Sequence, residues 1–169
     1  SIREPHGVTA HIIPWNYPLA LMGWKLAPAL AAGNTVVIKP SEVTPLSVLH
    51  WCSLIQSILP AGVINVVTGY GQSAGEPLVT HLDVPVITFT GSVATGKKIL
   101  HACADKTIPA IVELGGKSAG IVYPDADLES VVESARHGIF GVAGQICTAM
   151  SRLVVHKSIK DELITKLVN

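Results

Sequence analysis

One cysteine stands where a side chain could do covalent chemistry on a small molecule. Cys147 lies in the predicted loop Gly144-Gln145-Ile146-Cys147-Thr148, between a helix and a strand, and rigid elements hold reactive groups on such loops. A thiolate at this place would be a nucleophile. The alternative is a buried structural cysteine, and we interpret Cys52 and Cys103 in that way because both fall inside predicted helices.

Glu113 is unusual because it falls in the apolar run Ile111-Val112-Glu113-Leu114 at the end of a predicted strand. A carboxylate is costly to bury, and burial would make it a stronger base, able to activate water. The carboxyl ends of parallel strands are also where ligands bind in open α/β sheets. The alternative is an exposed residue on an edge strand, and the pattern alone does not choose between the two.

Three further segments follow predicted strands and carry groups suited to binding. Asn16, in Ile13-Pro14-Trp15-Asn16, has a side-chain amide that could donate a hydrogen bond, or it forms a turn or caps a helix. The junction from Phe89 to Gly96 offers amides and a helix dipole that suit a phosphate, although glycines at such junctions also serve packing alone. Lys39-Pro40-Ser41-Glu42 follows the second strand, where doubly wound folds bind an adenosine ribose; the alternative is a solvated charge pair.

The elements that position these residues alternate between strand-like and helix-like segments. This alternation predicts an α/β fold with a doubly wound, Rossmann-like parallel sheet. The predicted strands span residues 8–13, 35–38, 64–67, 86–89, 108–114, 119–123 and 153–155, and we expect the first four to be mutually parallel. The predicted helices span residues 19–32, 45–59, 72–81, 92–105, 127–142 and 160–169, the second of them capped by Thr44 and stopped by Pro60.

The strand–helix alternation breaks once. Predicted strands 108–114 and 119–123 are separated only by Gly115-Gly116-Lys117-Ser118, which is too short for a crossover helix. We therefore place a domain boundary after residue 114, with a second α/β domain beginning at residue 115.

Composition narrows the class of partner. Twelve Lys and Arg balance twelve Asp and Glu, so no basic field would attract nucleic acid or anionic lipid. The apolar segment 19–32 is interrupted by Lys25 and Pro28 and is too short to span a membrane. Scattered cysteines favour a reducing compartment such as the cytoplasm, and histidines without ligand spacing argue against a metal. Ser1 in place of Met suggests an excised fragment.

Five segments in order resemble the motif set of the aldehyde dehydrogenase superfamily: Ile13-Pro14-Trp15-Asn16, Lys39-Pro40-Ser41-Glu42, Phe89-Thr90-Gly91-Ser92, Glu113-Leu114-Gly115-Gly116-Lys117 and Gly144-Gln145-Ile146-Cys147. The resemblance covers essentially the whole chain, whereas whole members are longer at both ends. It implies that residues 1–114 are most of a dinucleotide-binding domain and that residues 115–169 begin a catalytic domain. We expect the full-length protein to form a homo-oligomer, and this stretch alone to be inactive.

The resemblance further implies NAD(P)-dependent oxidation of a small-molecule aldehyde to a carboxylic acid. Cys147 would form a thiohemiacetal whose oxyanion is held by the Asn16 amide and the Cys147 N–H, and Glu113 would activate the water that hydrolyses the thioester. NAD is expected, with NADP as the alternative, because the Glu42 carboxylate would repel a 2′-phosphate. The residues implied in cofactor binding are Ile13, Pro14, Trp15, Lys39, Ser41, Glu42, Gly91, Ser92, Gly96 and Leu114.

Two alternatives to this function stay open. Dehydrogenases that pass the acyl group to coenzyme A resemble the same pattern but lack the glutamate, so Glu113 favours release of the acid. A catalytically silent nucleotide-binding fragment is the other alternative. Product analysis tests the first alternative, and cofactor titration tests the second.

Overall fold

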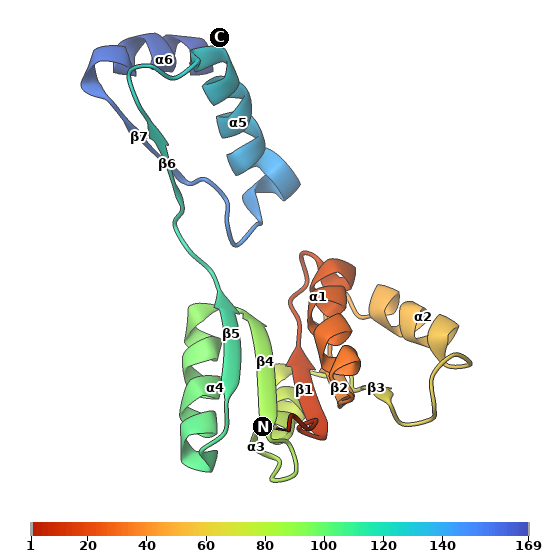
Figure 1. The fold of residues 1–169 in the computed structure, drawn as a ribbon. Helices are drawn as coiled ribbons and strands as arrows, with labels where there is room; N and C mark the ends of the chain where they lie inside the picture. The colour runs from red at the N-terminus through yellow and green to blue at the C-terminus, as the bar shows by residue number, and fades with distance from the viewer. Residues whose placement is uncertain (1, 169) are drawn as a thin grey trace. The chain divides into compact units, whose positions relative to one another are not determined.

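A computed structural model describes residues 2–168 of the chain, which divides into two compact units with the boundary between Leu114 and Gly115. In the first unit, five parallel strands form a sheet in the order β3-β2-β1-β4-β5 (Figure 1). Its elements are β1 (Val8–Ile12), α1 (Pro18–Ala31), β2 (Thr35–Lys39), α2 (Leu46–Ile55), β3 (Ile64–Val66), the π-helical turn η1 (Gly71–Gly75), α3 (Glu76–Thr80), β4 (Val86–Gly91), α4 (Val93–Lys106) and β5 (Ala110–Leu114). The predicted fold class and the parallel arrangement of the first four strands are confirmed.

Helices cover both faces of this sheet, because side chains alternate between the faces of a strand. On one face, Val36 and Ile38 of β2 pack with apolar residues of α1 and α2. On the other, Ile87 and Phe89 of β4 pack with apolar residues of α3 and α4. The sheet is therefore wound on both sides, as the alternating sequence predicts.

A buried histidine links the neighbouring strands β1 and β4. His11 on β1 is 2% exposed; its Nε2 lies 2.8 Å from the Thr9 hydroxyl, and its Nδ1 lies 2.9 Å from the Thr88 hydroxyl. Thr9 gives its single hydroxyl proton to the Thr35 carbonyl, 3.1 Å away, so it must accept from Nε2–H, and Thr88 must donate to Nδ1. Burial, and to a smaller extent the nearby Lys25 ammonium, lower the pKa of His11 to about 4.

This histidine predicts a loss of stability in mild acid. The unfolded ring takes up a proton near pH 6.5 and the folded ring only near pH 4, so the unfolded state binds more protons between these values. We expect the free energy of unfolding to fall by about 3 kcal/mol across this window, with no His11 contribution to pH dependence above it. Urea unfolding at pH 7 and pH 4 measures the loss. His11→Gln keeps a donor and an acceptor without titrating there, and equal losses in both proteins would contradict the assignment.

The second unit contains a two-stranded parallel sheet of β6 and β7, connected through α5 (Figure 1). Its elements are β6 (Ala119–Val122), α5 (Leu128–Phe140), the 3₁₀ turn η2 (Gly141–Gly144), β7 (Arg152–Val155), the 3₁₀ turn η3 (Lys157–Ile159) and α6 (Lys160–Val168). Asp127 caps α5 by accepting from the Ser130 N–H, and Lys166 of α6 donates to Glu129 of α5. The predicted last residue of the final helix, Asn169, lies outside the described residues.

Two helix ends and one cap differ from the sequence prediction, and the helix predicted over 72–81 is divided into the turn η1 and the short helix α3. The second helix ends at Ile55, not at residue 59, because the following turn tightens through an Ile58 N–H to Ile55 carbonyl bond. Its predicted cap, Thr44, instead donates to the Trp15 carbonyl. The helix predicted over 127–142 ends at Phe140, because Val142 has a positive φ. No helix within residues 2–168 is long and apolar enough to cross a membrane.

Candidate active site

Most of the predicted site residues of the first unit lie at the carboxyl edge of its sheet, which is the side where its strands end. The strands are parallel, so the segments after β1, β2, β4 and β5 all leave from the same edge. The strand order changes direction between β1 and β4, because β2 and β3 lie on one side of β1 while β4 and β5 lie on the other. The helix after β1, α1, packs on one face of the sheet, and the helix after β4, α4, packs on the opposite face. In open α/β sheets a crevice at such a switch point is the usual ligand site.

Lys39 and Glu42 form the most enclosed charged pair at this edge. The Lys39 side chain is 4% exposed; its Nζ donates to the Pro40 carbonyl at 3.0 Å and lies 3.8 Å from Glu42 Oε2, whose side chain is 44% exposed. Burial lowers the pKa of Lys39, and the Glu42 carboxylate partly offsets this. The lysine stem runs against the backbone of Gly75, where a Cβ would lie 3.5 Å from Lys39 Cδ. Ser41 accepts from the Val43 N–H, so it also supports the turn that carries Glu42.

The loop after β1 is tied to the loop after β2. The Ile13 N–H donates to the Lys39 carbonyl at 3.1 Å, and Thr44 donates to the Trp15 carbonyl at 3.2 Å. Ile13 is buried, Pro14 and Asn16 are half-buried, and Trp15 is exposed. These bonds fix the backbone from which Asn16 projects.

The glycine-bearing junction after β4 is shaped by packing. Ser92 caps α4 by accepting from the Thr95 N–H at 3.2 Å. A Cβ on Gly96 would lie 2.5 Å from Leu114 Cδ2, and one on Gly91 would lie 2.5 Å from the Phe89 ring. Glycine at position 96 lets α4 lie close to β5, and glycine at position 91 leaves room for the Phe89 ring of the same strand, so packing gives a reason for both glycines.

Glu113 is exposed, so the structure shows the second of the two alternatives for this residue, an exposed position on an edge strand. It lies on β5, the edge strand of the sheet, and Ile111 on the same face is 57% exposed. Alternate residues of β5 face opposite sides of the sheet. Within the apolar run 111–114, only Val112 and Leu114 pack against the core, so Glu113 faces the other side.

Two residues of the first unit were missed by sequence reasoning. Lys25 of α1 is half-buried, and its pKa is lowered by burial and raised back in part by Glu113. The available signal was a lone cation inside an apolar helix. The Thr90 hydroxyl, near the end of β4, is buried without a hydrogen-bond partner in residues 2–168. Most buried polar groups have a hydrogen-bond partner in the protein, in water or in a ligand. No sequence signal distinguished Thr90 from Thr88.

Cys147 belongs to the second unit and differs from the other two cysteines. It is exposed in the loop between η2 and β7, and its carbonyl oxygen lies 3.7 Å from where a Cβ on Gly116 would be. Cys103 is buried and Cys52 is half-buried, both within helices, and burial raises the pKa of both thiols. Of the three cysteines, Cys147 is therefore the one whose thiol a small molecule can reach most readily.

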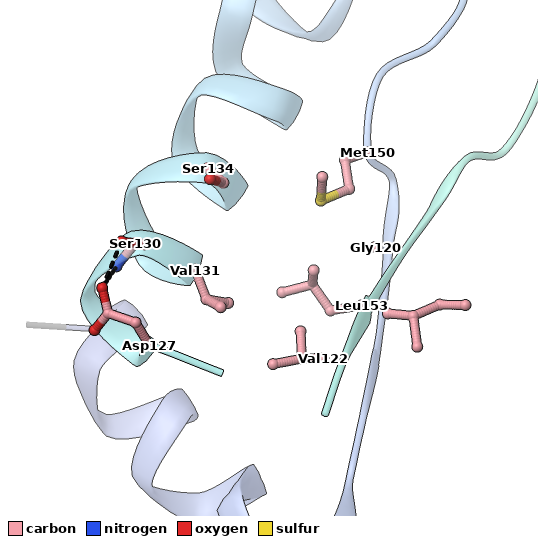
Figure 2. A pocket seen from close by; sticks show the side chains of 9 residues that line it. Gly120, Val122, Asp127, Ser130, Val131, Ser134, Met150 and Leu153 are labelled. Atoms are coloured by element: carbon pink, nitrogen blue, oxygen red, sulfur yellow. Dashed lines mark hydrogen bonds between the residues drawn. The ribbon is translucent and has the colours of Figure 1, made fainter. Parts of the chain in front are cut away.

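A pocket of about 270 Å³ in the second unit is not part of this chemistry. Figure 2 shows it between α5 and the strand pair, with Val131 and Ser134 on the α5 side and Leu153 and Met150 on the other. Its one charged lining residue, Asp127, already caps α5 through Ser130. Cys147 does not line it, and we interpret the pocket as a gap in the packing of helix on sheet.

Comparison with known proteins finds a matching family along the whole chain. The model of the aldehyde dehydrogenase family matches residues 1–169. "Aldehyde dehydrogenase, cytosolic 1" of Mus musculus is 51% identical over 168 residues, which are 98% of this chain and 34% of the relative. Betaine aldehyde dehydrogenase of Bacillus subtilis is 49% identical over 99% of this chain and 34% of its own length. The chain thus spans about a third of the length of these relatives.

Solved structures agree with the fold. The NAD⁺ complex of an aldehyde dehydrogenase from Bacillus cereus superposes with a TM-score of 0.94 and 44% identity, over 98% of this chain and 34% of that one. Betaine aldehyde dehydrogenase from Staphylococcus aureus, also in complex with NAD⁺, has a TM-score of 0.94 and 43% identity, over 98% of this chain and 33% of that one.

Proposed function

The chain belongs to the aldehyde dehydrogenase family, and on that basis we propose that the intact protein oxidises a small-molecule aldehyde to a carboxylic acid with NAD. The observation that carries the proposal is that Lys39, Glu42, Thr90 and Glu113 all lie at or just after the carboxyl ends of strands in one parallel sheet, in a chain whose exposed cysteine lies on a loop. Residues 1–114 would bind the dinucleotide, residues 115–169 would begin the catalytic domain, and the full-length protein would be a homo-oligomer.

The edge fits a dinucleotide on two observations. The buried Thr90 hydroxyl lacks a partner within residues 2–168 and offers a donor beside the switch point. Lys39 and Glu42 offer a cation and a carboxylate after β2, where a doubly wound site holds the adenosine ribose. Ser92 and the first turn of α4 would lie at the pyrophosphate, with Ile13, Pro14, Trp15, Ser41, Gly91, Gly96 and Leu114 lining the rest. Bound there, NAD would accept the hydride.

The first chemical step needs a nucleophile and an oxyanion site. The aldehyde carbon must become tetrahedral before hydride can leave, and the Cys147 thiolate would form that carbon–sulfur bond. The Asn16 amide and the Cys147 N–H would donate to the resulting oxyanion, each worth about 3–4 kcal/mol in comparable sites. Collapse of the thiohemiacetal then leaves a thioester on Cys147.

The second step needs a base that water can reach. Glu113 would take a proton from the water that attacks the thioester, which releases the acid and restores the thiol. Glu113 is exposed within residues 2–168, and its charge acts on the nearby Lys25 ammonium. A panel of aldehydes with NAD, followed by identification of the product, tests the proposal. Acyl-coenzyme A as the product would replace it with the acylating alternative.

Glu42 predicts the cofactor preference. Its carboxylate would repel the 2′-phosphate of NADP, so Glu42→Gln should narrow the kcat/KM preference for NAD over NADP by about tenfold, or roughly 1.4 kcal/mol. Kinetics with both cofactors measure the ratio. Glu42→Asp keeps the charge and should keep most of the preference, and an unchanged ratio in Glu42→Gln would remove Glu42 from the ribose site.

A further inference from the structure

Three consecutive residues before Cys147 adopt a left-handed backbone. Val142, Ala143 and Gly144 have φ values of 50°, 57° and 76°. Only glycine takes this conformation without cost; a β-branched residue such as valine is a marked outlier there. The other described non-glycine residue with a positive φ is Thr107, which stands singly at the end of α4. The only run of consecutive left-handed residues in residues 2–168 therefore ends three residues before Cys147.

Backbone contacts, not side-chain burial, hold this turn. The Gln145 N–H donates to the Val142 carbonyl at 3.1 Å and closes it. A Cβ on Gly144 would lie 3.1 Å from the Ile139 carbonyl oxygen, so the turn folds back closely on the end of α5. The side chains of Val142 and Ala143 are both exposed. Apolar packing of these two side chains therefore does not explain why the strain is kept.

The turn changes the surroundings of the Cys147 amide. If α5 continued through the loop, the Cys147 N–H would donate to the Ala143 carbonyl four residues earlier. The left-handed turn breaks that pattern, and no backbone hydrogen bond from the Cys147 N–H exists within the described residues. Beyond the cysteine, the chain is fixed again by a bond of 2.8 Å from the Met150 N–H to the Gly138 carbonyl. Cys147 is thus held at both sides while its own N–H is left available.

We propose that the left-handed turn of Val142, Ala143 and Gly144 positions Cys147, so that its thiol and its N–H act together on one carbonyl group. This inference rests on the proposed role of Cys147 as nucleophile. Strain of this kind persists where the surrounding structure imposes it, often at reactive sites. Val142 and Ala143 are positioning residues, because their backbone conformation sets the place of Cys147 and their exposed side chains take no part in the reaction.

Acylation by p-nitrophenyl acetate tests the proposal in the intact protein without any cofactor. The Cys147 sulfur bonds to the acetyl carbon, the aryl ester bond breaks, p-nitrophenolate leaves and the thiol proton goes to solvent. Ala143→Pro forbids the left-handed φ and should slow this burst about 100-fold, the scale expected for a misplaced reacting group. Alkylation of Cys147 by iodoacetamide needs no oxyanion site and should change little.

Val142→Asn is the matched variant that keeps the turn, because asparagine tolerates the left-handed region. It should acylate at the wild-type rate and raise the melting temperature. Thr107→Asn relieves strain of the same kind in the first unit and should raise the melting temperature with no effect on acylation. Should Ala143→Pro fail to fold, the double variant Val142→Gly, Ala143→Gly loosens the turn without a clash and should slow acylation more than alkylation.

Wild-type acylation by Ala143→Pro or by the double glycine variant would overturn the proposal. Equal slowing in Val142→Asn would overturn it as well, because the side chain and not the turn would then matter. Cys147→Ser separates this inference from the proposed function. If Cys147→Ser keeps the acylation burst, Cys147 is not the nucleophile and the proposed function fails. If Cys147→Ser loses the burst while Ala143→Pro and the double glycine variant keep it, the positioning role alone fails.

Discussion

Replacing Cys147 with serine is expected to stop aldehyde oxidation, with a loss in kcat on the order of 10⁶-fold, the scale seen when the nucleophile of a covalent enzyme is removed. A serine hydroxyl is far less ionised than a thiol near neutral pH, so neither the tetrahedral adduct nor the thioester forms at a useful rate. Rapid mixing of the intact protein with aldehyde and NAD would show no burst of NADH. Mass analysis would find no acyl adduct.

The other cysteines provide the control for this result. Cys103 is buried and Cys52 half-buried, and burial raises the pKa of both thiols. Cys52→Ser and Cys103→Ser should therefore leave the burst of NADH intact, although the second replaces a core residue and will cost stability. An acyl adduct on either of these cysteines in the wild-type protein would contradict the assignment of Cys147.

The fold was largely predictable because its signals are local. Alternating strand-like and helix-like segments predict a parallel sheet, and the four-residue link after Leu114 cannot hold a crossover helix. The predicted helix over 45–59 was too long because a tighter turn follows Ile55. The predicted helix over 127–142 failed differently. No local preference of Val142 or Ala143 indicates a left-handed turn, so the surrounding structure must impose it.

The candidate site was less predictable, because its electrostatics depend on pairing between distant segments. Glu113 lies in an apolar run, yet its exposure depends on β5 being an edge strand, which the sequence does not state. Lys25 is more than eighty residues from Glu113 in the chain, and only the fold brings their charges into range. The order of strands across the sheet is the missing information in both cases.

Replacing Glu113 with glutamine is expected to separate the two chemical steps. Hydride transfer needs the thiohemiacetal but no base for water, so the variant should still produce a burst of NADH. Hydrolysis of the thioester needs a proton acceptor, and the amide supplies none, so steady-state turnover should fall by about 10² to 10⁴-fold, the usual contribution of a general base. The acyl group would then accumulate on Cys147, and mass analysis of the stalled enzyme would detect it.

A matched control and a chemical rescue sharpen this expectation. Glu133, exposed on α5, is a matched control, and Glu133→Gln should keep both burst and turnover. An exogenous thiol should release the acyl group from Glu113→Gln, because a thiolate attacks the thioester without a base. Full steady-state turnover by Glu113→Gln, or loss of its burst, would show that hydrolysis does not depend on this carboxylate as proposed.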